Sequence, residues 1–166
     1  MTTVIVNDAS CLIDLRKGRL LHVMVALPFR FVVPFTVRES ELLKFTSQEW
    51  QMLEDGGLET HDLPPSQMAE AQNLQAQHPA LSTNDVICLV TTVQFDGAIL
   101  LTGDAALRRV AEAKAVQVHG VLWLLDQLQA AGVANANLLR SALMTWRDDP
   151  TVRLPPNEIE KRLRGR

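Results

Sequence analysis

Short apolar runs that are typical of buried strands alternate with helical patterns along most of the chain. The first run is Val-Ile-Val at residues 4–6, and others lie at 30–33, 58–63, 98–101 and 116–118. Between them the pattern indicates helices, at residues 12–15, 37–45, 66–78, 85–93, 105–113, 121–130 and 136–146. Strands that alternate with helices usually form a parallel sheet covered on both faces. The sequence therefore predicts an α/β fold, a three-layer α/β/α sandwich with a mostly parallel central sheet.

The chain has the length of one domain, with 166 residues. Hydrophobic residues make up 47% of it and charged residues 21%, which argues against a chain that is disordered throughout. Composition changes after residue 148, where prolines and a basic end replace the alternating pattern. We expect residues 1–148 to form the domain, including a C-terminal helical extension. We expect residues 149–166 to form a mobile basic tail, with one or two turns of helix beginning near Asn157.

Net charge and cysteine content limit the kind of ligand and the cellular compartment that we expect for this chain. The net charge of −3 argues against a protein that coats nucleic acid nonspecifically, although a local basic rim would still allow an RNA substrate. Cys11 and Cys88 both lie in apolar runs, which predicts buried free thiols in a reducing compartment. The N-terminus lacks the features of a signal peptide, and no apolar stretch is long enough to span a membrane. We therefore expect a cytoplasmic protein.

Four acidic residues occupy places where α/β proteins bind ligands. Asp8 follows the first predicted strand and Asp104 follows the strand at 98–101. Glu39 and Asp85 lie in the first turns of predicted helices. Ligand sites in open α/β sheets form beyond the carboxyl ends of the strands, which these four side chains can all reach. Taken one at a time, each acid is explained better as a helix cap or as a partner of the helix dipole than as a ligand.

If the four carboxylates converge, their mutual repulsion has to be relieved. Carboxylates that lie close together force one another to take up protons, whereas a divalent cation with oxygen ligands removes the repulsion. Such a cation can activate a water for attack on a phosphodiester and can neutralise charge in the transition state. This arrangement predicts Mg²⁺ or Mn²⁺ at the site and needs no histidine or cysteine nucleophile.

The ordered motifs resemble those of the PIN-domain family. The resemblance rests on four segments in sequence order, which are Val-Ile-Val-Asn-Asp8-Ala-Ser10, Val33-Pro34 with Thr36-Val37-Arg-Glu39, Leu81-Ser82-Thr-Asn-Asp85, and Leu100-Leu101-Thr102-Gly103-Asp104. Residues 118–122 also look like the last strand of the family and its following turn, so that the resemblance spans about residues 3–130. Beyond that span, the predicted helix at 136–146 and the tail would extend past the minimal family domain.

The resemblance implies a divalent-metal-dependent endoribonuclease. Asp8, Glu39, Asp85 and Asp104 match the catalytic, metal-binding acids, and Ser10 and Thr102 match hydroxyl positions that support the site. Many small family members of the VapC type are homodimeric toxins that a paired antitoxin protein silences. The resemblance thus implies an RNA substrate, a homodimer and a possible antitoxin partner.

A second acid, Glu41, lies two residues after Glu39 on the same predicted helix. Glu41 could be the inward acid in place of Glu39, and residues two apart on a helix do not share a face. We prefer Glu39 because the Thr-Val-x-Glu spacing fits the family pattern better.

Other functions fit the sequence less well. A phosphorylated receiver domain would need paired acids after the first strand and a lysine after the last core strand, and a haloacid-dehalogenase-type phosphatase would need Asp-x-Asp where Asp8-Ala9-Ser10 stands. The alternative that stays open is a PIN-like scaffold or partner-binding module without catalysis.

Among the remaining polar residues, Asp14 is expected to face solvent. Arg108 and Arg109 are equally compatible with an RNA path and with a solvated helix face.

Overall fold

Five parallel strands form the centre of the protein in a computed structural model that describes residues 2–165. The strands are β1 (Val4–Asn7), β2 (Arg30–Pro34), β3 (Glu59–His61), β4 (Ile99–Leu101) and β5 (Gln117–His119), in the order β3-β2-β1-β4-β5. In the register, Val6 of β1 pairs with Val32 on one side and with Leu100 on the other. The predicted α/β fold with a parallel sheet is thereby confirmed.

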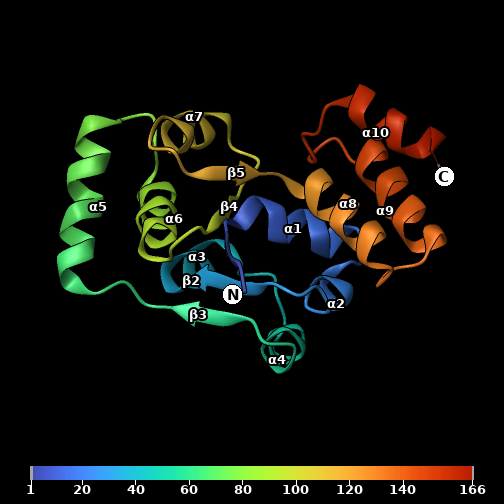
Figure 1. Cartoon of the computed structure of the whole chain (residues 1–166), viewed down its shortest axis with the longest axis horizontal. Coiled ribbons are helices and arrows are strands. Elements are labelled where there is room, and N and C mark those ends of the chain that lie inside the picture. Colours follow the sequence, from blue (N-terminus) through green and yellow to red (C-terminus); the bar gives the residue numbers. More distant parts are fainter. Residues whose placement is uncertain (1, 166) are drawn as a thin grey trace.

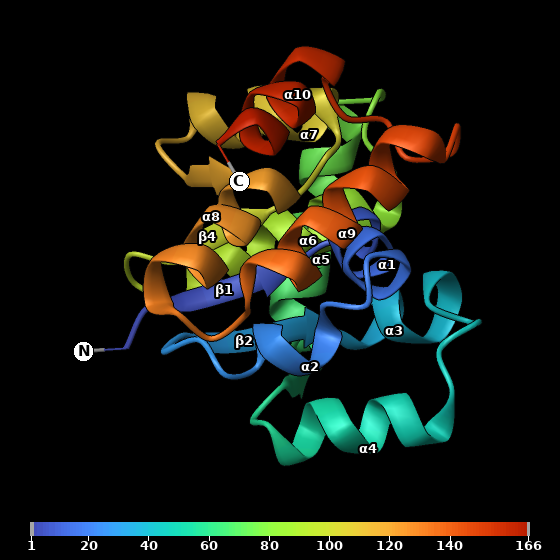
Figure 2. The same ribbon diagram turned by 90° about the vertical axis from the view of Figure 1, so that its right-hand side faces the viewer.

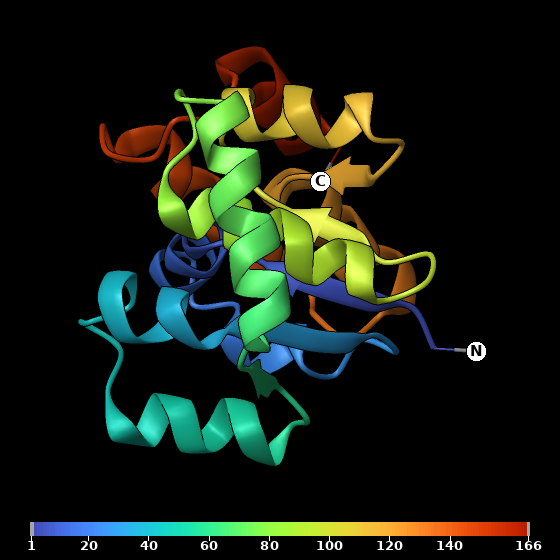
Figure 3. The ribbon, with the colours of Figure 1, turned by 90° about the vertical axis from the view of Figure 1, so that its left-hand side faces the viewer.

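Ten helices connect and cover these strands in the described part of the chain. They are α1 (Ala9–Lys17), α2 (Leu21–Met24), α3 (Phe35–Glu41), α4 (Ser47–Asp55), α5 (Pro65–Gln77), α6 (Thr83–Gln94), α7 (Ala105–Ala113), α8 (Val121–Ala131), α9 (Ala136–Asp148) and α10 (Pro156–Arg164). Helices α1, α8 and α9 lie on one side of the sheet (Figures 1 and 2), and α5 and α6 lie on the other (Figures 1 and 3). No helix within residues 2–165 has the length and apolarity needed to cross a bilayer.

The strand order determines where a ligand site can form. The chain moves outward from β1 to β2 and β3, and then crosses back to β4 and β5 on the other side of β1. The order therefore reverses between β1 and β4, and the connections that follow these two strands diverge there. In open α/β sheets such a switch point leaves a crevice at the carboxyl ends of the strands. Asp8 follows β1 directly, and Thr102, Gly103 and Asp104 follow β4, so that all four residues border this crevice.

Two short helices were absent from the sequence prediction. A single helix was expected over residues 37–45, but α3 ends at Glu41, and a separate helix α4 begins at Ser47. Thr46 caps α4 because its hydroxyl accepts from the Glu49 amide while the Glu49 carboxylate accepts from the Thr46 amide. Helix α2 is only one turn long, and one turn gives too few positions for a helical period to be visible.

The C-terminal segment is ordered rather than a mobile tail. The helix expected near Asn157 is present as α10, but it packs against α9 and buries Ile159 and Leu163. Arg162 binds both carboxylate oxygens of Asp126 in α8, at 2.9 and 2.8 Å. The basic composition that suggested a solvated tail thus belongs to the outer face of an amphipathic helix whose apolar face is in the core.

Candidate active site

Asp8 is the buried centre of the site. Its backbone N–H extends the sheet by donating to the Leu101 carbonyl at 3.0 Å, and its side chain caps α1 by accepting from the Ala9 N–H at 2.8 Å. The residue is only 6% exposed. The preceding Asn7 is fully buried and ties the ends of β1 and β2 together through a 3.1 Å bond from its amide to the Val32 carbonyl. Asp8 is therefore held rigidly at the carboxyl end of the central strand.

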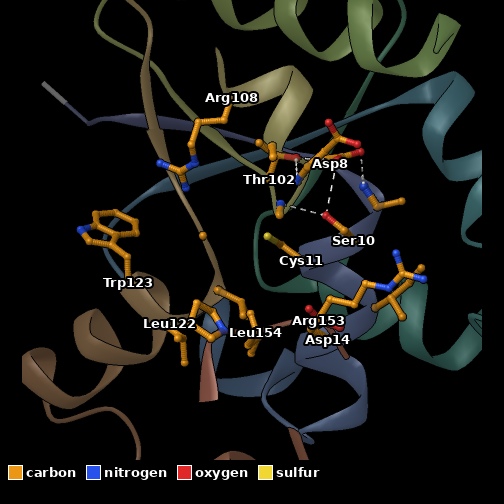
Figure 4. A pocket seen from close by; sticks show the side chains of 18 of the residues that line it. Asp8, Ser10, Cys11, Asp14, Thr102, Arg108, Leu122, Trp123, Arg153 and Leu154 are labelled. Atoms are coloured by element: carbon orange, nitrogen blue, oxygen red, sulfur yellow. Dashed lines mark hydrogen bonds between the residues drawn. The ribbon is translucent and has the colours of Figure 1, made fainter. Parts of the chain in front are cut away.

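Two hydroxyl groups hold the Asp8 carboxylate and the loop after β4 together (Figure 4). Thr102 Oγ1 donates to Asp8 Oδ2 at 2.7 Å and accepts from the Asp104 N–H at 3.1 Å. Ser10 Oγ lies 3.4 Å from Asp8 Oδ2 and accepts from the Gly103 N–H at 3.1 Å. Both hydroxyls that the sequence singled out thus lie beside Asp8, and they fix the position of Asp104 relative to it.

Asp104 and Asp85 each use only one carboxylate oxygen to cap a helix. Asp104 Oδ1 accepts from the Leu107 N–H at 2.8 Å at the start of α7, and Asp85 Oδ2 accepts from the Ser82 N–H at 2.9 Å in a capping box of α6. The other oxygen of each carboxylate accepts no hydrogen bond from any residue between 2 and 165. The cap explanation and the ligand explanation are therefore compatible, because each role uses a different oxygen.

The structure places Glu41, not Glu39, at the cavity, so the expected orientation of α3 was wrong. Glu41 and Glu39 are both exposed residues, but Glu41 lines the same cavity as Asp8, Asp85 and Asp104, whereas Glu39 lies outside it. The reason is the helical period, since the fully buried Val37 lies one turn before Glu41 and on the same face. The buried position Val37, rather than the spacing from Thr36, is the signal that would have identified Glu41.

The acids influence one another electrostatically. Burial raises the pKa of Asp8, and the nearby charges of Asp85 and Asp104 raise it further, against the opposing hydrogen bonds from Thr102 and Ala9. Burial also raises the pKa of Glu41, with added repulsion from Asp8 and Asp85. Four carboxyl groups thus share one region in which negative charge is poorly compensated.

The donor set fits a hydrated divalent cation. No three His, Cys, Asp or Glu side chains between residues 2 and 165 stand close enough to hold a metal ion all at once. Mg²⁺ keeps several of its waters and binds one or two carboxylates directly, so more widely spaced acids suit it. Burial and nearby negative charges raise the pKa of Asp8, and a bound cation would favour its ionised form. The oxygens of Asp85 and Asp104 that their helix caps leave unused could bind the same cation. Asp8, Glu41, Asp85 and Asp104 are the residues that would hold it.

The acids form one end of a cavity of about 840 Å³. Other parts of its wall include the start of α8 and residues 153–155, which the sequence analysis had assigned to the tail. Asp14 lines it too, instead of facing open solvent, and burial raises the pKa of Asp14 to about 6. Cys11 borders the cavity, and like Cys88 it is a buried free thiol, as predicted.

Replacing Thr102 with valine should weaken the fold and the site together. The change removes the donor to the buried Asp8 carboxylate and the acceptor of the Asp104 N–H, and leaving such buried groups unpaired costs about 1–3 kcal/mol. Urea unfolding at neutral pH measures this loss. Thr102→Ser keeps the hydroxyl and should retain most of the stability, and equal stability of the valine variant and the wild type would contradict the hydrogen-bond assignment.

Comparison with known proteins agrees with this arrangement. A family model described as a PIN domain matches residues 4–165, which includes α9 and α10. These helices were expected to lie beyond the family domain, and the match places them within it. No curated protein matches the chain. PIN domains have a nuclease-type fold, are generally nucleases and typically use divalent metals. With a match over nearly its whole length, and with the parallel sheet and acidic switch point described above, the chain belongs to the PIN-domain family.

Proposed function

We propose that this protein is an Mg²⁺- or Mn²⁺-dependent endoribonuclease that hydrolyses RNA phosphodiester bonds with water. The observation that carries the proposal is Asp8, a carboxylate that is buried at the switch point and faces the charges of Asp85 and Asp104. A fold does not need a buried acid in this electrostatic position for stability, since burying an incompletely paired charge costs free energy. Perturbed acids in a cavity are typical of functional sites.

Each residue of the site has a metal-binding or water-orienting role that follows from its position. A bound Mg²⁺ or Mn²⁺ would lower the pKa of a coordinated water and neutralise charge on the phosphoryl oxygens. Asp8 is the rigid ligand, because Thr102, Ser10 and the Ala9 amide fix its carboxylate. Asp85 and Asp104 each present one oxygen that their helix caps leave unused. Glu41 completes the set from α3 and can orient an attacking water through a hydrogen bond.

Cleavage of end-labelled total RNA tests the proposal. Purified protein is incubated with Mg²⁺ or Mn²⁺ and with EDTA, beside an Asp104→Asn variant purified in the same way. Cleavage that requires the metal and is lost in the variant supports a nuclease. Cleavage that survives the substitution identifies a contaminant or another site, and no cleavage by any form leaves the scaffold function as the better explanation.

Glutamine substitutions of Glu41 and Glu39 form a matched pair of variants on the same helix. Because Glu41 lines the cavity and Glu39 does not, Glu41→Gln should weaken Mn²⁺ binding about tenfold, whereas Glu39→Gln should leave it unchanged. Electron paramagnetic resonance of free Mn²⁺ during titration gives both affinities. If only Glu39→Gln weakened Mn²⁺ binding, Glu39 and not Glu41 would be the acid of α3 at the metal site.

The biological setting is also part of the proposal. By its resemblance to VapC-type proteins, the chain would be the toxin of a toxin–antitoxin pair, act as a homodimer in the cytoplasm, and be silenced by an antitoxin protein. The exposed apolar side chains Phe35, Leu43, Val93 and Met144 are candidates for such contacts. Light scattering of the purified protein gives the mass in solution, and a short neighbouring reading frame for a DNA-binding protein would support the toxin role.

A further inference from the structure

Glu41 and Asp85 reach the cavity from the ends of two different helices. Asp85 is in the first turn of α6, where the capping box with Ser82 fixes its carboxylate. Glu41 is the last of the seven residues of α3 and is exposed. The last turn of a helix lacks helical partners for its carbonyls and tends to fray. The helix itself therefore fixes Glu41 less firmly than the capping box fixes Asp85.

Asn84 links the ends of these two helices. Its side-chain amide donates to Ser40 Oγ at 2.9 Å, and Ser40 Oγ in turn donates to the Thr36 carbonyl one turn earlier in α3. The Asn84 side chain also acts on the Glu41 carboxylate as a hydrogen-bond donor, which lowers the pKa of that group. Within residues 2–165, no other residue of α6 forms a hydrogen bond or an ion pair with α3. Asn84 is therefore the polar connection between Glu41 and the helix that carries Asp85.

This connection acts against repulsion between the acids. Burial and the negative charges of Asp8 and Asp85 raise the pKa of Glu41, whereas the hydrogen bond from Asn84 favours the ionised form. The amide of asparagine is a neutral donor, so it can hold a carboxylate beside other carboxylates without neutralising the charge that attracts a cation. Without Asn84, repulsion would favour a Glu41 side chain that turns away from the other acids into solvent.

We propose that Asn84 is a positioning residue of the metal site, which holds the Glu41 carboxylate within reach of a cation bound by Asp8 and Asp85. Asn84 does not line the cavity, so it acts through Glu41 and not as a ligand. A side chain that is ordered before the cation arrives loses less conformational freedom on binding. Hydrogen-bond partners that orient metal ligands in this way contribute to metal affinity. The inference rests on the metal site of the proposed nuclease function.

The Mn²⁺ affinity of an Asn84→Ala variant tests the positioning role. Electron paramagnetic resonance of free Mn²⁺ at one fixed pH should show binding about fivefold weaker than in the wild type, the change expected for the loss of one hydrogen bond. Alanine is a strong helix former, so α6 should keep its structure. Thr83→Ala is the matched control, because Thr83 lies in the same turn and outside the cavity, and its hydroxyl donates to Gln75 of α5. The control should bind Mn²⁺ as the wild type does.

The same substitution in a Glu41→Gln background shows whether Asn84 acts through Glu41. Asn84→Ala should weaken Mn²⁺ binding far less there than in the natural chain, because the carboxylate that it positions is already gone. An equal loss in both backgrounds, wild-type affinity in Asn84→Ala, or an equal loss in Thr83→Ala would overturn the positioning role while leaving the metal site in place. A wild type that binds no Mn²⁺ would overturn the metal site, and the positioning role with it.

Discussion

Replacing Asp8 with asparagine is expected to reduce RNA cleavage about a thousandfold or more while making the metal-free protein more stable. Losing a direct ligand of a catalytic cation removes several kcal/mol of transition-state stabilisation, and about 4 kcal/mol corresponds to a thousandfold in rate. Asparagine caps a helix as well as aspartate does, so the start of α1 at Ala9 should be retained. A gain in stability with a loss of activity is typical of a residue selected for function.

The stability gain depends on pH in a defined direction. Burial, then Asp85 and Asp104, raise the pKa of Asp8 in the folded protein, so the folded state holds this proton more tightly than the unfolded chain does. As pH rises through the ordinary aspartate pKa and then the raised one, ionisation of Asp8 destabilises the fold, and above both values the full penalty is present. Below the ordinary pKa the penalty is absent.

Melting temperatures in EDTA between pH 4 and pH 8 test this dependence. The Asp8→Asn variant should melt above the wild type at high pH, by roughly 2–4 °C for each kcal/mol of relieved repulsion, and the difference should shrink toward pH 4. Asp96→Asn, on the exposed loop before β4, serves as a control that should change neither melting nor cleavage. A variant that loses stability at every pH would show that Asp8 is a structural cap above all.

Replacing Trp146 with alanine should cost about 3–5 kcal/mol of folding free energy and leave a cavity beneath α9. The side chain is 1% exposed, and its indole N–H donates to the Asp14 carbonyl of α1 at 2.7 Å. A Cβ at Gly18 would lie 3.1 Å from the ring, which shows how closely α1 and α9 approach. The melting temperature should fall by about 10 °C.

Phenylalanine at position 146 separates packing from hydrogen bonding. Trp146→Phe keeps most of the apolar volume and loses the donor to Asp14, so it should cost clearly less than the alanine variant, about 1–3 kcal/mol. A loss below about 1 kcal/mol in Trp146→Ala would contradict the conclusion that α9 is integral to the domain. Urea unfolding of the three proteins gives the comparison.

The sequence was sufficient for the sheet because the signal there is local. Val4-Ile5-Val6 and Ile99-Leu100-Leu101 are short buried runs next to turn residues, and the acids that follow them are placed by strand ends alone. Asp8 and Asp104 could therefore be located without coordinates. The α/β fold and the family resemblance followed from the same local patterns.

Features set by tertiary packing were not visible in the sequence. The orientation of α3 depends on Val37 being buried, and a seven-residue helix gives too few turns to define its buried face. The order of residues 149–165 depends on Ile159 and Leu163 finding a groove beside α9, while their basic neighbours indicate solvent. Consequently, the wall of the cavity opposite the acids could not be foreseen.

Crystals soaked with Mn²⁺ and measured at the manganese absorption edge test the central claim most directly. The anomalous difference map should show a peak in the cavity beside Asp8, with at least one oxygen of Asp85, Asp104 or Glu41 near enough to bind directly or through water. The peak should be absent in Asp8→Asn. No peak in the cavity at saturating Mn²⁺, or a peak that Asp8→Asn leaves unchanged, would contradict a metal site built from these acids.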